Sequence, residues 1–197
     1  MRVTFSTIAI VLVFGFVWWQ KREISHGPGI VAPNAPTQEA APSAGGFEYG
    51  DFRLVPRANF EIEARVLGKE RYWIGREARL SPYDLALGWG RMSDEAVLEE
   101  FSIWQSKRFY WWMSSSLPIP ADVVTLQSAN VHIIPSDDAV RRAVASLRTG
   151  HIVRLRGQLV DAAAGSGWRW RTSMSREDKG NGACEILWVE SISVIDP

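Results

Sequence analysis

The sequence predicts a mostly β domain of the α+β class, a small and partly closed antiparallel barrel, preceded by a transmembrane helix. Three observations support this. Short segments that alternate apolar and polar residues recur along the second part of the chain. One amphipathic segment with helical spacing separates two of them. An uncharged apolar run stands near the N-terminus. A generic α+β sandwich is the alternative fold.

Composition limits the class of protein. The 197 residues are 46% apolar and include 10 tryptophans, which suffices for one domain with a core and an appendage. The formal net charge is zero, so no global attraction to nucleic acid or anionic membranes is indicated. The single cysteine, Cys184, excludes an intrachain disulfide and a zinc site with several cysteine ligands. We expect no cofactor and no metal.

The apolar run covers residues 3–19 and ends in Trp18 and Trp19. Its length meets the lower limit of about 17 residues for a spanning helix, and tryptophan favours membrane interfaces. Gln-Lys-Arg-Glu follows the run, where a cleaved signal peptide would carry small residues. The sequence therefore predicts an uncleaved anchor at residues 1–22, with a cleaved signal peptide or a buried helix as alternatives.

Residues 23–56 are predicted to be a linker, because the stretch from residue 27 to residue 46 is rich in Pro, Ala and Gly. Such a spacer would hold the globular domain, residues 57–197, away from a bilayer. Basic residues on the two sides of the apolar run nearly balance, so charge does not decide the orientation. The spacer favours a single-pass protein of the bacterial inner membrane with a periplasmic domain.

The domain is predicted to begin with a strand at residues 60–66, which alternate apolar and charged residues. Proline at the first helical position predicts a short helix over residues 81–90, which two glycines would end. A second short helix is expected after Ser93, its N-cap. The aromatic run at residues 103–113 predicts one strand with both faces covered.

The next predicted strand covers residues 123–134. Apolar residues spaced three and four apart after Ser136 predict a helix, and residues 151–160 predict another strand. Turn sequences separate two final strands at residues 168–174 and 185–195. A helix between the third and fourth strands is the connectivity of an OB-type barrel, so the predicted barrel is OB-like.

Three phrases resemble a family of uncharacterised bacterial proteins that carry a single N-terminal membrane span. They are LSPYDLALGWGRMSD at residues 80–94, SANVHIIP at residues 128–135, and GACE at residues 182–185 after REDKG at residues 176–180. The likeness would cover residues 60–197. It implies the anchored layout and no particular activity.

Ser128, Asn130 and His132 would share one face of the third strand, between apolar neighbours. Buried polar groups need partners, so this row indicates either a ligand pocket or a structural hydrogen-bond network. Cys184 could be a nucleophile with His132 as its base, and Asp178 or Glu185 could orient the imidazole. More often, a lone cysteine is a small buried apolar residue.

A second candidate site is a basic face. Arg154 and Arg156 would share one face of a strand, and Arg169 and Arg171 one face of its partner. If both pairs point outward, four guanidinium groups could bind single-stranded nucleic acid or another polyanion. A solvated face is the alternative, and the near-zero net charge favours it, so nucleic acid is not the expected partner.

The tryptophans of the domain would mostly form core, but exposed ones could bind sugars or proline-rich chains. They are Trp73, Trp89, Trp104, Trp111, Trp112, Trp168, Trp170 and Trp188.

No convergent catalytic set is evident, so the sequence favours a membrane-anchored, non-enzymatic binding or assembly module whose ligand and protein partner are unknown. Two alternatives remain. One is a hydrolase or transferase that uses His132 with Cys184 or Asp178. The other is a polyanion-binding or single-stranded nucleic-acid-binding OB-like barrel.

Overall fold

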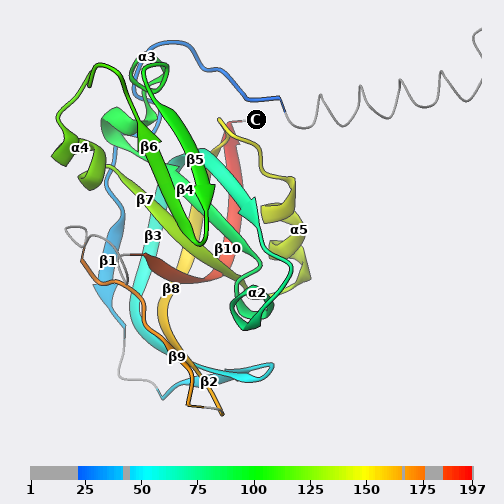
Figure 1. Ribbon diagram of the computed structural model, residues 1–197. Coiled ribbons are helices and arrows are strands. Elements are labelled where there is room, and N and C mark those ends of the chain that lie inside the picture. Colours follow the sequence, from blue (N-terminus) through cyan, green and yellow to red (C-terminus); the bar gives the residue numbers. More distant parts are fainter. Residues whose placement is uncertain (1–21, 42–44, 166, 176–183, 197) are drawn as a thin grey trace, which may run out of the picture.

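A computed structural model describes residues 22–41, 45–165, 167–175 and 184–196 (Figure 1). The predicted anchor at residues 1–22 therefore lies, apart from its last residue, outside the described part of the chain. Within the described ranges, no helix combines the length and apolar character that crossing a bilayer requires.

Five strands form a sheet that closes on itself. Hydrogen-bonded neighbours follow the order β3-β4-β7-β10-β8, and β8 pairs again with β3. Only β7 and β10 run parallel; the other pairs in the ring are antiparallel. The strands are β3 (Phe52–Arg71), β4 (Tyr83–Gly88), β7 (Ser128–Pro135), β8 (Ile152–Ala164) and β10 (Glu185–Asp196). The prediction of a mostly β, barrel-like fold is confirmed.

The length and irregularities of β3 allow the ring to close. The register shifts between Pro56 and Ala58 and again between Val66 and Gly68. Each irregularity bends and twists the strand. As a result, residues 52–65 pair with β8, while the strand turns its opposite edge to β4 along residues 65–71.

Apolar side chains that alternate along the strands fill the interior of the ring. β3 contributes Phe60, Ile62, Ala64 and Val66, and each is almost fully buried. Leucine, isoleucine and valine side chains from the other four strands complete this core. Burying one such side chain stabilises the fold by about 1.5–3 kcal/mol.

The helix predicted after Ser136 is confirmed as α5 (Asp138–Ser146), which packs Val140 and Val144 against this core. The sequence suggests Ser136 as the N-cap, but the structure uses the next residue, Asp137. The Asp137 carboxylate accepts a hydrogen bond from the backbone N–H of Val140 at 2.8 Å.

The predicted helix at residues 81–90 is wrong, because Tyr83–Gly88 form strand β4; a short helix, α2 (Arg76–Leu80), precedes it. All six residues of β4 are buried. Leu85 and Leu87 face the interior, and Asp84 and Ala86 lie on the covered outer face. A strand buried on both faces lacks the alternation that distinguishes it from a helix.

Residues 103–113 form a hairpin rather than one strand. Its strands are β5 (Ser102–Ser106) and β6 (Phe109–Met113). Lys107 and Arg108 have φ angles of 53° and 71°, and a two-residue turn with both central residues at positive φ is typical of tight hairpins. The usual Asn or Gly is missing from this turn, so the sequence does not indicate it.

The remaining elements agree with the sequence to different degrees. The second short helix is α3 (Glu95–Leu98), capped by Asp94 and preceded by the 3-10 turn η1 (Gly90–Ser93). The first half of the strand predicted at residues 123–134 is helix α4 (Ala121–Leu126), and only β7 follows. The strands predicted at residues 151–160 and 185–195 are confirmed as β8 and β10, and the return at residues 168–174 contains only the short β9 (Arg169–Trp170).

The structure differs from the predicted linker at residues 23–56. β1 (Thr37–Ala40) and β2 (Phe47–Tyr49) both pair with β3. Upstream of them, the Ile24 N–H donates to the Thr149 carbonyl at 3.0 Å, and Ala32 is 1% exposed. The chain thus packs on the domain from Ile24 onward, and the periplasmic placement loses the support of a long spacer.

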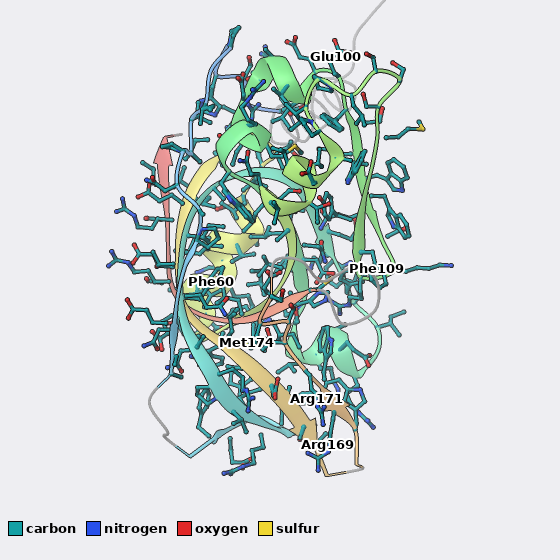
Figure 2. The ribbon with its side chains drawn as sticks, turned by 90° about the vertical axis from the view of Figure 1, so that its left-hand side faces the viewer. Phe60, Glu100, Phe109, Arg169, Arg171 and Met174 are labelled. Atoms are coloured by element: carbon teal, nitrogen blue, oxygen red, sulfur yellow. The ribbon has the colours of Figure 1, made fainter. Side chains whose placement is uncertain are left out.

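The domain is elongated and has two distinct ends (Figures 1 and 2). The α3–α4 end contains residues 22–32, α3, α4 and the open end of the β5–β6 hairpin. The α2–β9 end contains α2, β2 and β9, and the tip of the hairpin points toward it (Figure 1), with Arg108 beside Glu77 of α2 and Trp170 of β9. Glu100 marks the first end and Arg169 the second in Figure 2.

Candidate functional site

Ser128, Asn130 and His132 do share one face of β7, and the β5–β6 hairpin covers that face. The Ser128 and Tyr110 hydroxyls form a hydrogen bond. Asn130 Oδ1 accepts from Gln105 Nε2 at 2.8 Å, and its Nδ2 donates to the Arg108 carbonyl at 3.0 Å. Ser128 and Asn130 thus belong to a hydrogen-bond network that fastens the hairpin to the sheet.

His132 has a partner that sequence reasoning missed. Its Nδ1 lies 2.9 Å from Asp84 Oδ1, and both side chains are buried. The same oxygen accepts a hydrogen bond from Arg108 Nη1 at 2.8 Å. Asp84 therefore carries the charge that balances Arg108 and orients the imidazole. The only signal in the sequence is a carboxylate inside an otherwise apolar run at residues 83–88.

Arg108 holds the hairpin tip in place by three further contacts. Its guanidinium donates to the Ser81 carbonyl at 2.9 Å and stacks 3.7 Å from the centre of the Tyr72 ring. Its backbone N–H donates to the Tyr72 hydroxyl at 3.0 Å. Burial, with the nearby Asp84 charge, raises the pKa of Tyr72, so this hydroxyl stays protonated.

A pocket of about 310 Å³ opens beside His132, at the α2–β9 end. The Trp170 ring lies 4.6 Å from the His132 ring at an angle of 44°. The pocket is bounded by α2, the hairpin tip, β7 and the segment around β9. Its lining residues are Glu77, Arg108, Phe109, His132, Trp170, Arg171 and Cys184.

The second carboxylate oxygen of Asp84, Oδ2, is buried and accepts no hydrogen bond from any described residue. Leaving a buried polar atom unpaired costs about 1–3 kcal/mol, and more for a charged group. Asp84 does not line the pocket itself, but its partners Arg108 and His132 do. Across the described residues, no group of three or more His, Cys, Asp and Glu side chains is placed to hold a metal ion.

Cys184 lines the pocket but does not pair with His132. Its sulfur lies 3.8 Å from the Arg108 carbonyl oxygen and 3.9 Å from Asn130 Nδ2. Cys184 and His132, both described residues, form no hydrogen bond with each other. Burial, reinforced by the charges of Glu185 and Asp84, raises the pKa of the thiol to about 12. The sulfur therefore stays a thiol at neutral pH and is a weak nucleophile. Asp178 lies outside the described residues.

The four arginines of the predicted basic face do not form one surface. Arg156 Nε lies 2.9 Å from Glu61, and Arg154 Nε donates to Glu63 at 2.8 Å, because these residues are directly opposite across β3 and β8. Arg169 pairs with Ala163 on β8. Ala163 lies nine residue steps along β8 from Arg154, about 30 Å of strand. The first pair is neutralised, whereas Arg169 and Arg171 lie exposed at the α2–β9 end (Figure 2).

Arginines lie against aromatic rings on the elements near the pocket. Arg71 stacks 3.4 Å from the centre of the Trp73 ring, and Trp73 is 72% exposed. Arg76 lies 5.8 Å from the Trp168 ring. Arg108, stacked on Tyr72, also lies 5.7 Å from the Trp170 ring. Among the tryptophans elsewhere, Trp89 is core, Trp112 and Trp188 are half-buried, and Trp104 and Trp111 are exposed on the hairpin.

Comparison of the chain with protein-family models, with curated proteins and with solved structures finds no match. The function of the site is therefore inferred from its geometry.

Proposed function

We propose that the protein is a membrane-anchored, non-enzymatic binding module of the OB type, which binds an anionic ligand at its α2–β9 end. Three features support the OB assignment: the strand order β3-β4-β7-β10-β8, the parallel β7–β10 pair, and α5 between the third and fourth strands. The anchor is the apolar run at residues 3–19, in a bacterial inner membrane.

The placement of the pocket carries the proposal. OB barrels bind ligands on their second and third strands and in the loops that join strands one to two and four to five. In this chain, the corresponding strands are β4 and β7, and the first loop is residues 72–82. The second loop joins β8 to β10 and contains β9. The hairpin covers the outer face of β4 and β7, so the open part of that region is the pocket, which Glu77 of the first loop and Trp170 of the second loop line.

The charge and rings around the pocket favour an anionic ligand with flat groups. Arg169 and Arg171 form no salt bridge with a described residue, in contrast to Arg154 and Arg156. Exposed Trp73 offers a ring face backed by Arg71. Aromatic rings interleaved with arginines are the arrangement that holds single-stranded nucleic acid, with stacking worth about 1–3 kcal/mol per base.

The test compares two charge-matched variants of the full chain in mild detergent. Arg169→Gln with Arg171→Gln removes the exposed pair, and Arg154→Gln with Arg156→Gln removes the neutralised pair. A labelled single-stranded oligonucleotide and a non-nucleic polyanion serve as probes in fluorescence anisotropy at low salt.

We expect the first variant to bind at least about tenfold more weakly and the second to stay within about twofold of the wild type. If each of the two arginines contacts one phosphate, the slope of log K against log salt falls by about 1.4 in the first variant only. Equal loss in both variants would indicate non-specific charge attraction. Absence of binding to either probe at micromolar protein would refute an anionic ligand of this kind.

An enzyme of the hydrolase or transferase type is the second candidate, favoured by one contact. Asp84 beside His132 Nδ1 is the arrangement that makes Nε2 of a histidine a general base. Cys184, with its raised pKa, does not supply the nucleophile, so this candidate requires an activated water or a substrate hydroxyl. Turnover of activated esters that His132→Asn abolishes, in a variant that stays folded, would establish it.

A further inference from the structure

We propose that the α3–α4 end of the domain lies on the surface of the lipid bilayer, so that the α2–β9 end and its pocket point away from the membrane. The inference rests on the anchor of the proposed function, and it adds an orientation and a membrane-contacting surface. It is based on where the chain first packs on the domain and on how little chain precedes that point.

Residues 24–26 are held at this end by side chains and backbone of the barrel. The Ile24 N–H donates to the Thr149 carbonyl at 3.0 Å, and the Ile24 carbonyl accepts from Arg65 at 3.4 Å. The His26 N–H donates to the Glu95 carboxylate at 2.7 Å, and Arg65 forms a 3.0 Å salt bridge with the same carboxylate. Arg65 is almost fully buried, so these contacts are part of the folded domain.

Two further features show that the barrel is shaped for this segment. Gly150 has φ +96°, and a Cβ at that position would meet the Ile24 carbonyl oxygen at 2.1 Å. Downstream, the backbone of Ala32 bonds to the Ser93 hydroxyl at 3.1 Å and to the Gly90 N–H at 2.8 Å. Residues 24–32 therefore belong to the rigid part of the domain.

The remaining connection to the anchor is short. Trp19 ends the apolar run and Ile24 is already fixed, so five Cα steps separate them. At most, these steps span about 17 Å. From this end, β8 runs eleven residue steps from Ile152 to Ala163, where β9 pairs, about 36 Å of strand. A connection of that length holds the α3–α4 end at the membrane surface and keeps the other end away from it.

Exposed apolar side chains lie on the segments at this end and give the bilayer a surface to contact. The N-terminal segment, the end of β6, the following loop and α4 each contribute one (Figure 1). Such side chains enter the headgroup region readily, and each adds buried apolar area. They are Ile30, Met113, Leu117 and Leu126, with exposed fractions of 46%, 62%, 49% and 44%.

The charges nearby predict which lipids matter. Glu99, Glu100 and Asp122 are exposed at this end, and so are the basic residues Arg22 and Arg91. Because charges of both signs are present, we expect the contact to depend on apolar insertion rather than on lipid charge. It should therefore form equally well on vesicles of purely zwitterionic phosphatidylcholine.

The test uses the full chain in phosphatidylcholine vesicles with Cys184→Ser as background. A fluorophore is attached at Glu100→Cys or at Arg169→Cys, the two ends marked in Figure 2. Lipids with a nitroxide on the headgroup quench only fluorophores close to the surface. We expect quenching at residue 100 at least about threefold stronger than at residue 169. Equal quenching, or stronger quenching at residue 169, would overturn the orientation.

A second pair of variants tests the apolar contact. Met113→Glu with Leu117→Glu should reduce the quenching at residue 100 by about half, whereas Ile74→Glu, at the opposite end, should leave it unchanged. Unchanged quenching in the first variant would refute the contact. If the chain is a dimer in detergent and the fluorophore at residue 100 is shielded from solvent there as strongly as in vesicles, a second copy covers this surface. That result would overturn the proposal.

Failure of the anchor itself is measured separately. Vesicles are washed at high pH and floated on a density gradient, and a chain without a span is released. Loss of the chain in that wash refutes the membrane anchor of the proposed function. Retention with equal quenching at both ends refutes only the orientation.

Discussion

Replacing Asp84 by asparagine is expected to destabilise the protein by about 3 kcal/mol. Asp84 Oδ1 pairs with Arg108 at 2.8 Å and with His132 Nδ1 at 2.9 Å, and the carboxylate is fully buried. Breaking a buried pair by removing one partner costs about 3–5 kcal/mol, because the other charge remains uncompensated. The Arg108 side chain is still 18% exposed, so water partly compensates its charge, and the expected cost lies at the lower end of this range.

The exposed pair of Arg79 and Asp51, 3.2 Å apart, provides the matched control. Both of its side chains are more than half exposed, so Asp51→Asn should cost less than about 1 kcal/mol. Urea unfolding of the full chain in mild detergent, followed by tryptophan fluorescence, measures the difference.

With an m-value of about 2 kcal/mol/M, the midpoint of Asp84→Asn should fall by about 1–2 M urea. Hydrogen exchange in the hairpin should rise as well, because Arg108 loses its fixed partner. A midpoint within about 0.3 M of the wild type would show that the network contributes little to stability. In that case, the buried carboxylate would have to be explained by ligand binding or catalysis alone.

Three further outcomes are expected. Cys184, with its pKa raised to about 12 by burial, should react with iodoacetamide at pH 8 at least about a hundredfold more slowly than in the urea-unfolded chain; similar rates would contradict the burial. Burial and the nearby charges of Arg148, Lys69 and His26 lower the pKa of His151, so His151 binds a proton more readily in the unfolded chain than in the folded one. The contribution of neutral His151 to stability is therefore fully present above pH 6.5 and is lost as the pH falls toward the lowered pKa of the folded state. In urea titrations between pH 7 and pH 5, His151→Gln should lose less stability than the wild type. Gly150→Ala should destabilise the chain by about 2 kcal/mol and expose residues 22–32 to protease, since the new Cβ meets Ile24; unchanged proteolysis would contradict the packing of this segment.

Elements with one covered face can be predicted from the sequence, and elements covered on both faces cannot. Apolar and polar residues alternate along β8 and β10, which are predicted as strands, and the apolar stripe of α5 predicts that helix. β4 is buried all round, so its apolar run is also compatible with a helix, and that prediction is wrong. Composition also misleads at residues 23–56, because Pro, Ala and Gly are typical of spacers, whereas the packing partners, such as Arg65 and Gly150, lie far along the chain.

The candidate site can be predicted only in part for the same reason. The row Ser128, Asn130 and His132 follows from the period of one strand. Asp84 is 48 residues from His132, and Arg108 reaches both only because an unrecognised turn brings the hairpin back over the sheet. Pairings of this kind depend on strand register, which a single sequence does not reveal.

The β5–β6 hairpin contributes both to the stability of the fold and to the lining of the pocket. Arg108 fastens the hairpin through Asp84 and Ser81, and the same guanidinium lines the pocket beside Trp170. An anion that enters the pocket would therefore compete with Asp84 for Arg108. Because Asp84 Oδ2 already lacks a described partner, any weakening of its Oδ1 contact raises the cost of that buried charge. Ligand binding and hairpin stability should thus be coupled, so that Asp84→Asn, which frees Arg108, binds the anionic probe more tightly while it unfolds more easily.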